Sequence, residues 1–319
     1  MEKSLSSKVR NMDNYNQRSF HHDYYKPFIY HIILKKKKGC IDFGTLRGKA
    51  GIRKGSKGYP YVYLSESGRA IVAGLKEFEK EVREIQKFHY KIMPDHLHMI
   101  IYKKIYTPIH LDDYMENLKE RICNHYNKIF GSNFLKEDIF TQGYTDKALY
   151  DNVVLRNWIV YLDDNPNRRL TILENPGYFK RIHRLKIEDR YFEAYGNPFL
   201  WENPDKYAVR MRRRFTCDER LFHKEEALYQ ASRGSVLVSP FKSEFEKEVR
   251  DIAELNGFPY ILIQYQRFPE NFKPPKHQFE LCSRGKLLII SLGLDPKTPL
   301  TYDICTMMNE LAADIAKGS

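Results

Sequence analysis

The hydrophobic pattern of the first half of the chain alternates between short and long apolar stretches. Short stretches rich in aromatic and β-branched residues are typical of strands, and they occupy residues 28–34, 59–64, 88–93 and 97–102. Apolar residues at helical spacing predict helices over residues 67–86, 111–130 and 146–162. The order of these elements favours an α+β fold, in which an antiparallel sheet is covered by helices.

The third predicted helix has a clear reason to end near residue 162. Asn165-Pro166 follows it, and a proline cannot continue a helix and restrains the residue before it. We therefore expect the helix to stop just before this pair.

The second half of the chain has a different pattern. Beyond Gly234, continuous apolar runs (SVLVSPF, YILIQY and KLLIISL) alternate with helical stretches at residues 243–256 and 302–316. This alternation is typical of a small parallel α/β unit. We predict a first domain over residues 1–185, a basic and aromatic linker or helical extension over 186–230, and a small α/β domain over 231–319.

The charge of the chain is distributed unevenly. The formal net charge is +12 and the pI is near 9.2. Residues 226–319 hold 11 Lys+Arg and 12 Asp+Glu, so the basic excess lies in residues 1–225. Clustered Lys and Arg gain affinity for polyanions by releasing counterions. The composition is compatible with a nucleic-acid partner for the first part, although many basic proteins bind no nucleic acid.

Neither secretion nor membrane insertion is indicated. Residues 1–18 are polar, and no apolar run approaches the length of about 18 residues that a span requires. The cysteines are odd in number and form no CxxC pair, which argues against a disulfide framework or a zinc knuckle; they are Cys40, Cys123, Cys217, Cys282 and Cys305. We expect a soluble, cytoplasmic protein with reduced thiols.

The most informative local pattern is MPDHLHMII at residues 93–101. Residues two apart on a strand point to the same face, so His96 and His98 would present their imidazoles side by side. With a third ligand and open water positions, such a pair suits Mg²⁺ or Mn²⁺. By spacing alone, ordinary polar surface is the commoner reading. His31 could approach from a neighbouring strand, but a buried core histidine is the commoner outcome there.

The segment MPDHLHMII resembles the MPxHxHxxx motif of the REP-associated tyrosine transposases and their insertion-sequence relatives, an HUH family. In that family a downstream helix carries a tyrosine four residues before an Asn-Pro pair. Here WIVYLDDNP, at residues 158–166, has Tyr161 and Asn165 at this spacing, and IFTQGYTD at residues 139–146 is also similar. The resemblance covers roughly residues 24–185.

The resemblance implies a ferredoxin-like HUH domain with a small Rossmann-like extension at the C-terminal end. Tyr161 and Asn165 share one side of a helix, so Asn165 is implied as the third metal ligand with His96 and His98. Tyr161 is the implied nucleophile, which would form a 5′-phosphotyrosine and free a 3′-OH for later rejoining. The implied function is a metal-dependent, single-stranded DNA transposase that acts on single-stranded or hairpin DNA.

Other interpretations remain open. Tyr161 could be a core aromatic, and Asn165 could simply end the helix, a role that asparagine often takes. The chain has 23 tyrosines, and those that compete as nucleophile by position are Tyr126, Tyr144 and Tyr150. A replication initiator or relaxase with HUH chemistry, or a domesticated non-catalytic DNA-binding protein, is the alternative function.

Several charged residues near the motifs need a role. Residues 167–170 (NRRL) depart from the apolar residue, basic pair and glycine usual in the family, and we expect Arg168 and Arg169 to hold DNA phosphates instead. Asp163 and Asp164 would either attract metal or repel DNA. The glycine-rich stretch 39–58 predicts a loop or hairpin tip over the DNA backbone. Further predicted DNA contacts are Lys35, Lys36, Lys37, Lys38, Arg47, Arg53, Arg210, Arg212, Arg213 and Arg214.

The role of the C-terminal domain is the least defined. A Gly234-Ser235 turn could bind phosphate, yet no GxGxxG or Walker motif is present. We expect this domain to bind another protein or a phosphate ligand and to serve as a scaffold. The sequence also leaves a homodimer open.

Overall fold

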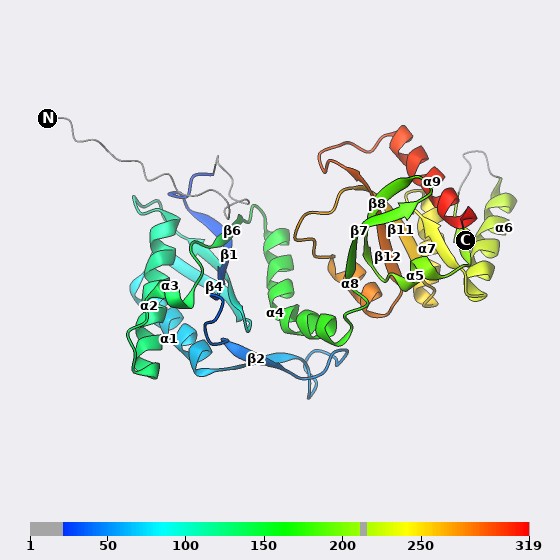
Figure 1. Cartoon of the computed structure of the whole chain (residues 1–319). Helices are drawn as coiled ribbons and strands as arrows, with labels where there is room; N and C mark the ends of the chain where they lie inside the picture. Colours follow the sequence, from blue (N-terminus) through cyan, green and yellow to red (C-terminus); the bar gives the residue numbers. More distant parts are fainter. Residues whose placement is uncertain (1–21, 211–215, 319) are drawn as a thin grey trace. The chain divides into compact units, whose positions relative to one another are not determined.

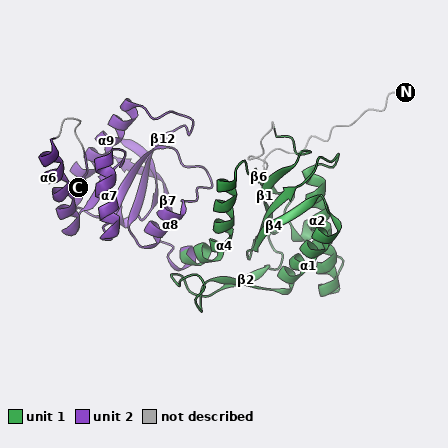
Figure 2. Ribbon diagram, turned by 180° about the vertical axis from the view of Figure 1, so that it is seen from behind, with its two compact units in different colours: residues 1–171 green, residues 172–319 purple. Residues whose placement is uncertain are grey.

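The computed structural model describes residues 22–210 and 216–318. The chain divides into two compact units, Met1–Thr171 and Ile172–Ser319, which Figure 2 colours green and purple. The second unit thus begins at residue 172, well before the predicted domain start at residue 231. Each unit has its own sheet and its own core.

Within the described residues, unit 1 contains a four-stranded sheet in the order β4, β5, β1, β6. Figure 1 labels β1, β4 and β6 of this sheet. These strands are β1 (Phe28–Lys35), β4 (Ile85–Ile92), β5 (His96–Lys103) and β6 (Thr145–Ala148). Helices α1 (Glu66–Glu81) and α2 (Leu111–Phe130) join them in the β-α-β-β-α-β order of ferredoxin-like folds, and a short α3 (Lys136–Ile139) precedes β6. All strand pairs are antiparallel, so the predicted α+β fold is confirmed.

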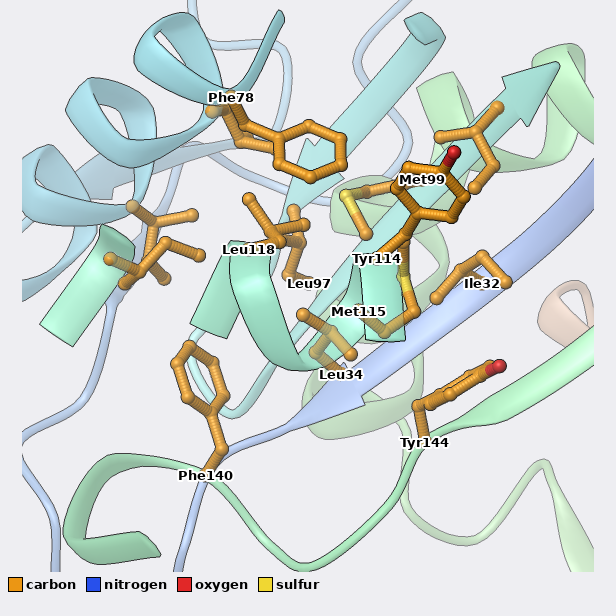
Figure 3. Packing of buried hydrophobic residues seen from close by; sticks show 14 of the residues in the cluster. Ile32, Leu34, Phe78, Leu97, Met99, Tyr114, Met115, Leu118, Phe140 and Tyr144 are labelled. Carbon is orange, nitrogen blue, oxygen red and sulfur yellow. The ribbon is translucent and has the colours of Figure 1, made fainter. Parts of the chain in front are cut away.

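The core of unit 1 lies between this sheet and helices α1 and α2. Alternate residues of a strand face opposite sides, and Ile32, Leu34, Leu97 and Met99 are fully buried on the helix side. Figure 3 shows these side chains packed together with Phe78 of α1. The alternating positions, such as Ile29 of β1 and His98 and Ile100 of β5, face the other side of the sheet.

Local sequence signals define the two core helices. Ser65 caps α1 by accepting a hydrogen bond from the Gly68 N–H at 3.2 Å. Helix α1 ends at Glu81 rather than at residue 86, because strand β4 already begins at Ile85. Helix α2 has the predicted bounds, and the residue that caps its C-terminal end is Gly131, whose φ of 59° suits a glycine.

The glycine-rich stretch after β1 forms a separate hairpin. Its strands, β2 (Gly44–Arg47) and β3 (Tyr61–Leu64), make a two-stranded sheet of their own. Gly48 has a φ of 107°, and a Cβ there would lie 2.7 Å from the Gly58 carbonyl oxygen, so the arms can approach this closely only at a glycine. The predicted strand at residues 59–64 therefore belongs to the hairpin and not to the main sheet.

Helix α4 (Asn152–Glu174) corrects the prediction for residues 146–162. It starts later than expected and continues through Pro166. Pro166 has no N–H for the Leu162 carbonyl, which weakens the helix locally, and Figure 1 draws α4 with a bend. Leu162 and Thr171, on either side of the proline, are buried, so packing maintains the helix across it.

Asp146, expected at the start of that helix, lies in strand β6 instead. It is the Cα partner of Ile32 on β1. Its carboxylate is buried and accepts a hydrogen bond from the Tyr24 hydroxyl at 2.7 Å. The pairing of β6 with β1 completes the sheet at this edge.

Unit 2 contains, in its described part, a six-stranded sheet in the order β7, β8, β12, β11, β10, β9. The strands are β7 (Lys180–Ile187), β8 (Arg190–Gly196), β9 (Lys206–Ala208), β10 (Val236–Ser239), β11 (Tyr260–Gln266) and β12 (Leu287–Leu294). Strands β9 to β12 are parallel, which confirms the predicted parallel α/β pattern, whereas β8 pairs antiparallel with β12 and with β7.

The helices of unit 2 cover both faces of its sheet. One face packs against α6 (Cys217–Ser232), α7 (Glu244–Leu255) and α8 (Lys276–Ser283), and the other against α9 (Tyr302–Lys317). A short α5 (Phe199–Glu202) follows β8. Because β8, β9 and most of α6 fall within residues 186–230, this segment is an integral part of unit 2 and not the predicted linker or helical extension.

In the part of the chain that the structure describes, no helix is long and apolar enough to cross a membrane.

Candidate active site

The face of the unit 1 sheet that α4 covers carries the histidine pair. His96 and His98 alternate along β5 with the buried core residues Leu97 and Met99. Their Nε2 atoms lie 2.9 Å apart, which confirms that the two imidazoles meet. His98 is buried, whereas the side chain of His96 is 23% exposed, so the pair is open on one side.

Helix α4 brings a third side chain to this point. The Nδ2 atom of the Asn165 side-chain amide lies 3.1 Å from His98 Nε2, and Asn165 is buried. The nitrogen and oxygen of an amide exchange places by a half-turn about the last side-chain bond. Two imidazoles and one amide therefore converge from β5 and α4.

The second nitrogen of each imidazole contacts a neighbouring side chain. His96 Nδ1 lies 2.6 Å from the Asp95 carboxylate, and His98 Nδ1 lies 3.0 Å from His31 Nε2. The hydrogen bond with His96 lowers the pKa of the Asp95 carboxyl to about 2. The buried His31 in turn stacks on Trp158 of α4. Metal-binding histidines commonly donate their second N–H in this way, which orients the other nitrogen toward the metal.

The donor set fits a divalent cation such as Mg²⁺ or Mn²⁺. Adjacent ligands about 2.1 Å from an octahedral ion lie about 3.0 Å apart, whereas tetrahedral zinc would require about 3.3 Å. The 2.9 Å between the two histidine Nε2 atoms is close to the octahedral value, and the 3.1 Å from His98 Nε2 to the Asn165 amide would be a ligand separation with Oδ1 in the place of Nδ2. Hydrogen bonds have similar lengths. The fit to a divalent cation therefore depends on the kinds of side chain that converge, which are two imidazoles and one amide.

The Asn165 amide is essential to this fit. Among residues 22–210 and 216–318, no group of three or more His, Cys, Asp and Glu side chains could hold a metal ion. A metal ion at His96 and His98 would take the Asn165 amide as its third protein ligand and water or phosphate oxygens at the other positions of an octahedron.

Tyr161 lies on the same side of α4 as Asn165, as their spacing predicts. The centroid of its ring is 6.3 Å from that of His98, and the Arg168 guanidinium lies 5.3 Å from the Tyr161 ring centroid. Tyr161 is half-buried and Arg168 is buried. The helix thus presents the Tyr161 phenol and the Asn165 amide beside His98, with the Arg168 guanidinium next to the Tyr161 ring.

The competing tyrosines lie elsewhere in unit 1. Tyr144 donates a hydrogen bond to Asp112 at 2.8 Å, and Tyr126 packs in the core with α1 and α2. Tyr150 is 70% exposed and contacts Phe28. Of the four candidates, Tyr161 is the one beside His98.

Asp163 and Asp164 connect α4 to its neighbours. Asp163 lies 3.2 Å from Lys54 of the hairpin and 3.0 Å from His89 of β4. Burial alone would raise the pKa of the Asp163 carboxyl, but its positive neighbours, Lys54 first, lower it overall. Asp164 accepts a hydrogen bond from the Tyr59 hydroxyl at 3.0 Å. Both carboxylates therefore hold the helix in place. Asp163 contacts basic side chains, and Asp164 accepts a hydrogen bond from a hydroxyl group.

The predicted DNA contacts on and after β1 differ in their surroundings. Lys35 is exposed and is the Cα partner of His96. Lys36 pairs with Asp42 at 2.7 Å, and Lys37 is in an ion pair with an acidic side chain of α3. Lys35 is thus better placed than its two neighbours to reach a phosphate at the site.

The predicted arginine contacts are mostly exposed. Arg47 lies over the ring of Tyr63 at 4.5 Å. Among the predicted DNA contacts, the exposed arginines are Arg47, Arg53, Arg169 and Arg210. Arg168 is buried beside Tyr161, and this position does not favour a contact with a distant DNA phosphate. Arg212, Arg213 and Arg214 lie outside the described residues.

Two residues on β4 were not predicted to lie near the site. Lys91 is the Cα partner of His98, and His89 is the partner of Ile100, so both point to the face that α4 covers. The alternation of His89 and Lys91 with Tyr90 and Ile92 was a usable signal for a half-buried strand. Their register against β5 could not be predicted from the sequence, because cross-strand pairing depends on the whole sheet.

Unit 2 has a cavity of about 1310 Å³ at the carboxyl ends of β9 and β10. Arg210 and Lys242, which follow these strands, contribute to its lining. The Gly234-Ser235 turn precedes β10 and therefore lies at the opposite end of that strand. Parallel α/β sheets bind ligands at the carboxyl ends of their strands, so the fold does not favour the predicted phosphate role of this turn.

Comparison with known proteins gives a weak structural likeness to a solved structure. No protein-family model matches the chain, and no curated protein matches it either. The solved structure of a REP-associated tyrosine transposase bound to a REP hairpin aligns with 48% of this chain and 74% of its own, at 10% identity and a TM-score of 0.34. A similarity of this size is too weak to establish a shared fold.

Proposed function

We propose that the chain is a metal-dependent, single-stranded DNA transposase that cleaves and rejoins DNA through a 5′-phosphotyrosine on Tyr161. The observation that carries this proposal is the meeting of Tyr161 and Asn165 of α4 with the histidine pair of β5. Asn165 and His98 are 67 positions apart, so their contact does not follow from sequence spacing. The resemblance of both motifs to HUH transposases supports the same function.

Each residue of the site has a defined task in this reaction. His96, His98 and Asn165 would hold the divalent cation, which when bound polarises the scissile phosphate. The Tyr161 phenol oxygen forms a bond to phosphorus while the bond from phosphorus to the 3′ oxygen breaks. The proton lost by the phenol balances the proton gained by the 3′ oxygen. Attack of a 3′-OH on the adduct reverses these steps and joins two strands.

Two lysines are placed to orient the DNA. Lys35 and Lys91 are the Cα partners of His96 and His98 on the two neighbouring strands. Positive side chains on both sides of the pair would bind the phosphates that flank the cut and align the diester for attack. A DNA partner also agrees with the basic excess of residues 1–225.

A covalent-adduct assay tests this function. The full-length protein, with Mg²⁺ or Mn²⁺, is incubated with labelled DNA hairpins that carry randomised single-stranded flanks, and denaturation-resistant adducts are collected. Wild type and Tyr150→Phe should form adducts through the 5′ phosphate, and Tyr161→Phe should form none. Added strands with a free 3′-OH should be joined to the captured DNA, which separates strand transfer from cleavage alone.

The other outcomes identify the alternatives. An adduct in Tyr161→Phe would assign the nucleophile to another residue. Hydrolysis without an adduct would make the protein a metal-dependent nuclease. Binding of the hairpins with neither cleavage nor adduct would favour the non-catalytic DNA-binding protein, and cleavage without joining would favour a replication initiator or relaxase.

A further inference from the structure

A groove lies beside the candidate active site, between the β2–β3 hairpin, the terminal sheet strand β4 and helix α4. Its volume is about 560 Å³, within the range of about 300–1,000 Å³ typical of ligand sites. The side chains that give it its character are aromatic and basic: Lys54, Tyr59, Tyr61, Tyr90 and Lys91. Asp163 and Pro166 of α4 complete the lining.

The groove is lined by neighbours of the proposed metal ligands. Asp163 and Pro166 lie on either side of Asn165 in the sequence of α4. Lys91, in the groove, is the Cα partner of His98, and such cross-strand partners have Cβ atoms about 5 Å apart. A strand cut at the histidine pair would therefore enter the groove with the nucleotides next to the cut.

One exposed tyrosine in the lining of the groove offers an aromatic surface. Tyr61 is 49% exposed and lines the groove. Tyr63, two residues along β3, is 53% exposed, but the Arg47 guanidinium covers its ring at 4.5 Å. The two residues are alike in type, exposure and strand, and they differ in their position relative to the groove.

The charge of the groove is suited to a phosphate chain. The Asp163 carboxylate lies 3.2 Å from Lys54 and 3.9 Å from Lys91, so its charge is already balanced. The side chain of Lys54 is 64% exposed, and that of Lys91 is 30% exposed. Both ammonium groups can thus approach phosphate oxygens while they remain near Asp163.

We propose that this groove binds the unpaired nucleotides of single-stranded DNA that adjoin the cut, with a base stacked on Tyr61 and phosphates near Lys54 and Lys91. The proposal rests on the proposed function, since it assigns a place to the strand that Tyr161 attacks. Stacking on an aromatic ring requires a free base face. In a duplex that face is covered by the neighbouring base pairs, so the groove selects unpaired DNA.

Binding of an oligothymidylate of about 16 nucleotides, the upper end of single-strand site sizes, tests the proposal. Affinity is measured by fluorescence anisotropy in full-length Tyr161→Phe, which removes cleavage from the assay. Adding Tyr61→Ala should weaken binding by about tenfold, as expected for one lost base–aromatic stack, and adding Tyr63→Ala should leave binding unchanged. Lys54→Gln should lower the slope of log affinity against log salt by about 0.7. Thermal melts check that each variant is folded.

The opposite results would overturn the proposal. Equal affinity in the Tyr61→Ala and parent proteins, or an equal loss with Tyr63→Ala, would show that the groove does not take the base. Tighter binding of a duplex or of oligouridylate of the same length would contradict the assignment to single-stranded DNA. In these cases adduct formation by the wild type would still support the proposed function. If the parent does not bind the oligonucleotide and the wild type forms no adduct, both proposals fail.

Discussion

Asn165 and His98 lie 67 positions apart in the chain, and their side chains meet at 3.1 Å. Asn165 directly precedes the proline that was expected to end the helix. Because α4 continues through Pro166, Asn165 is enclosed by helical turns on both sides and is buried against the sheet. The amide therefore has a fixed position beside the imidazoles, which an asparagine at a frayed helix end would not have.

Removing one imidazole should impair metal binding more than it impairs the fold. His96→Ala should weaken Mn²⁺ binding by about tenfold or more, the order of loss that follows changes at metal sites. Its side chain is partly exposed, so the melting temperature should change little. His98→Ala should weaken binding similarly but also lower the melting temperature, because His98 is buried. Free Mn²⁺ can be followed by electron paramagnetic resonance during titration.

A third histidine provides the matched control for this experiment. His89 lies on the same face of the sheet and contacts Asp163. His89→Ala should therefore retain the Mn²⁺ affinity of the wild type. Unchanged affinity in His96→Ala, or an equal loss in His89→Ala, would contradict the assignment of the pair as metal ligands.

Tyr59 should make the stability of unit 1 sensitive to alkali. Burial and the nearby Asp164 carboxylate raise the pKa of the Tyr59 phenol to about 12. The protonated phenol is favoured in the folded state, so its contribution is complete below the unfolded pKa of about 10 and is lost as the pH rises through the folded pKa. Tyr59→Phe should lower the free energy of unfolding by about 1 kcal/mol near neutral pH.

The pH dependence distinguishes this hydrogen bond from simple packing. The difference in the free energy of unfolding between wild type and Tyr59→Phe should shrink as the pH rises from about 10 to about 12. Urea unfolding followed by circular dichroism measures it, with the exposed Tyr63→Phe as the control. A difference that does not vary over this range would mean that the Tyr59–Asp164 contact is not its source.

The sequence predicted those parts of the molecule that depend on local pattern. The alternation around His96 and His98 is a period of two, and it correctly places both side chains on one face of β5. The spacing of Tyr161 and Asn165 correctly places them on one side of α4. The bounds of α4 were wrong, because a local rule about Pro166 was outweighed by buried contacts before and after it.

The parts that depend on long-range pairing were not predictable. Lys91 reaches the site only through the register of β4 against β5. The assignment of residues 186–230 to a linker or helical extension was wrong for a similar reason: β8 and β9 join their sheet by pairing with β12 and β10, which lie far along the chain. A single sequence contains no direct signal for such pairings.

Truncation should separate the two units only at the boundary that the structure defines. A fragment that ends at residue 230 keeps β7, β8 and β9 but loses β10, β11 and β12, which lie between β8 and β9 in the sheet. It would expose apolar strand faces, so it should aggregate or be digested rapidly by protease.

A fragment that ends at Gly177 keeps all of α4 and the whole of unit 1. It should melt cooperatively and, if unit 1 is sufficient for the chemistry, form the Tyr161 adduct. Limited proteolysis and thermal melting of both fragments check this, and a cooperative melt of the longer fragment with an unfolded shorter one would show that β7, β8 and β9 belong to the fold of unit 1.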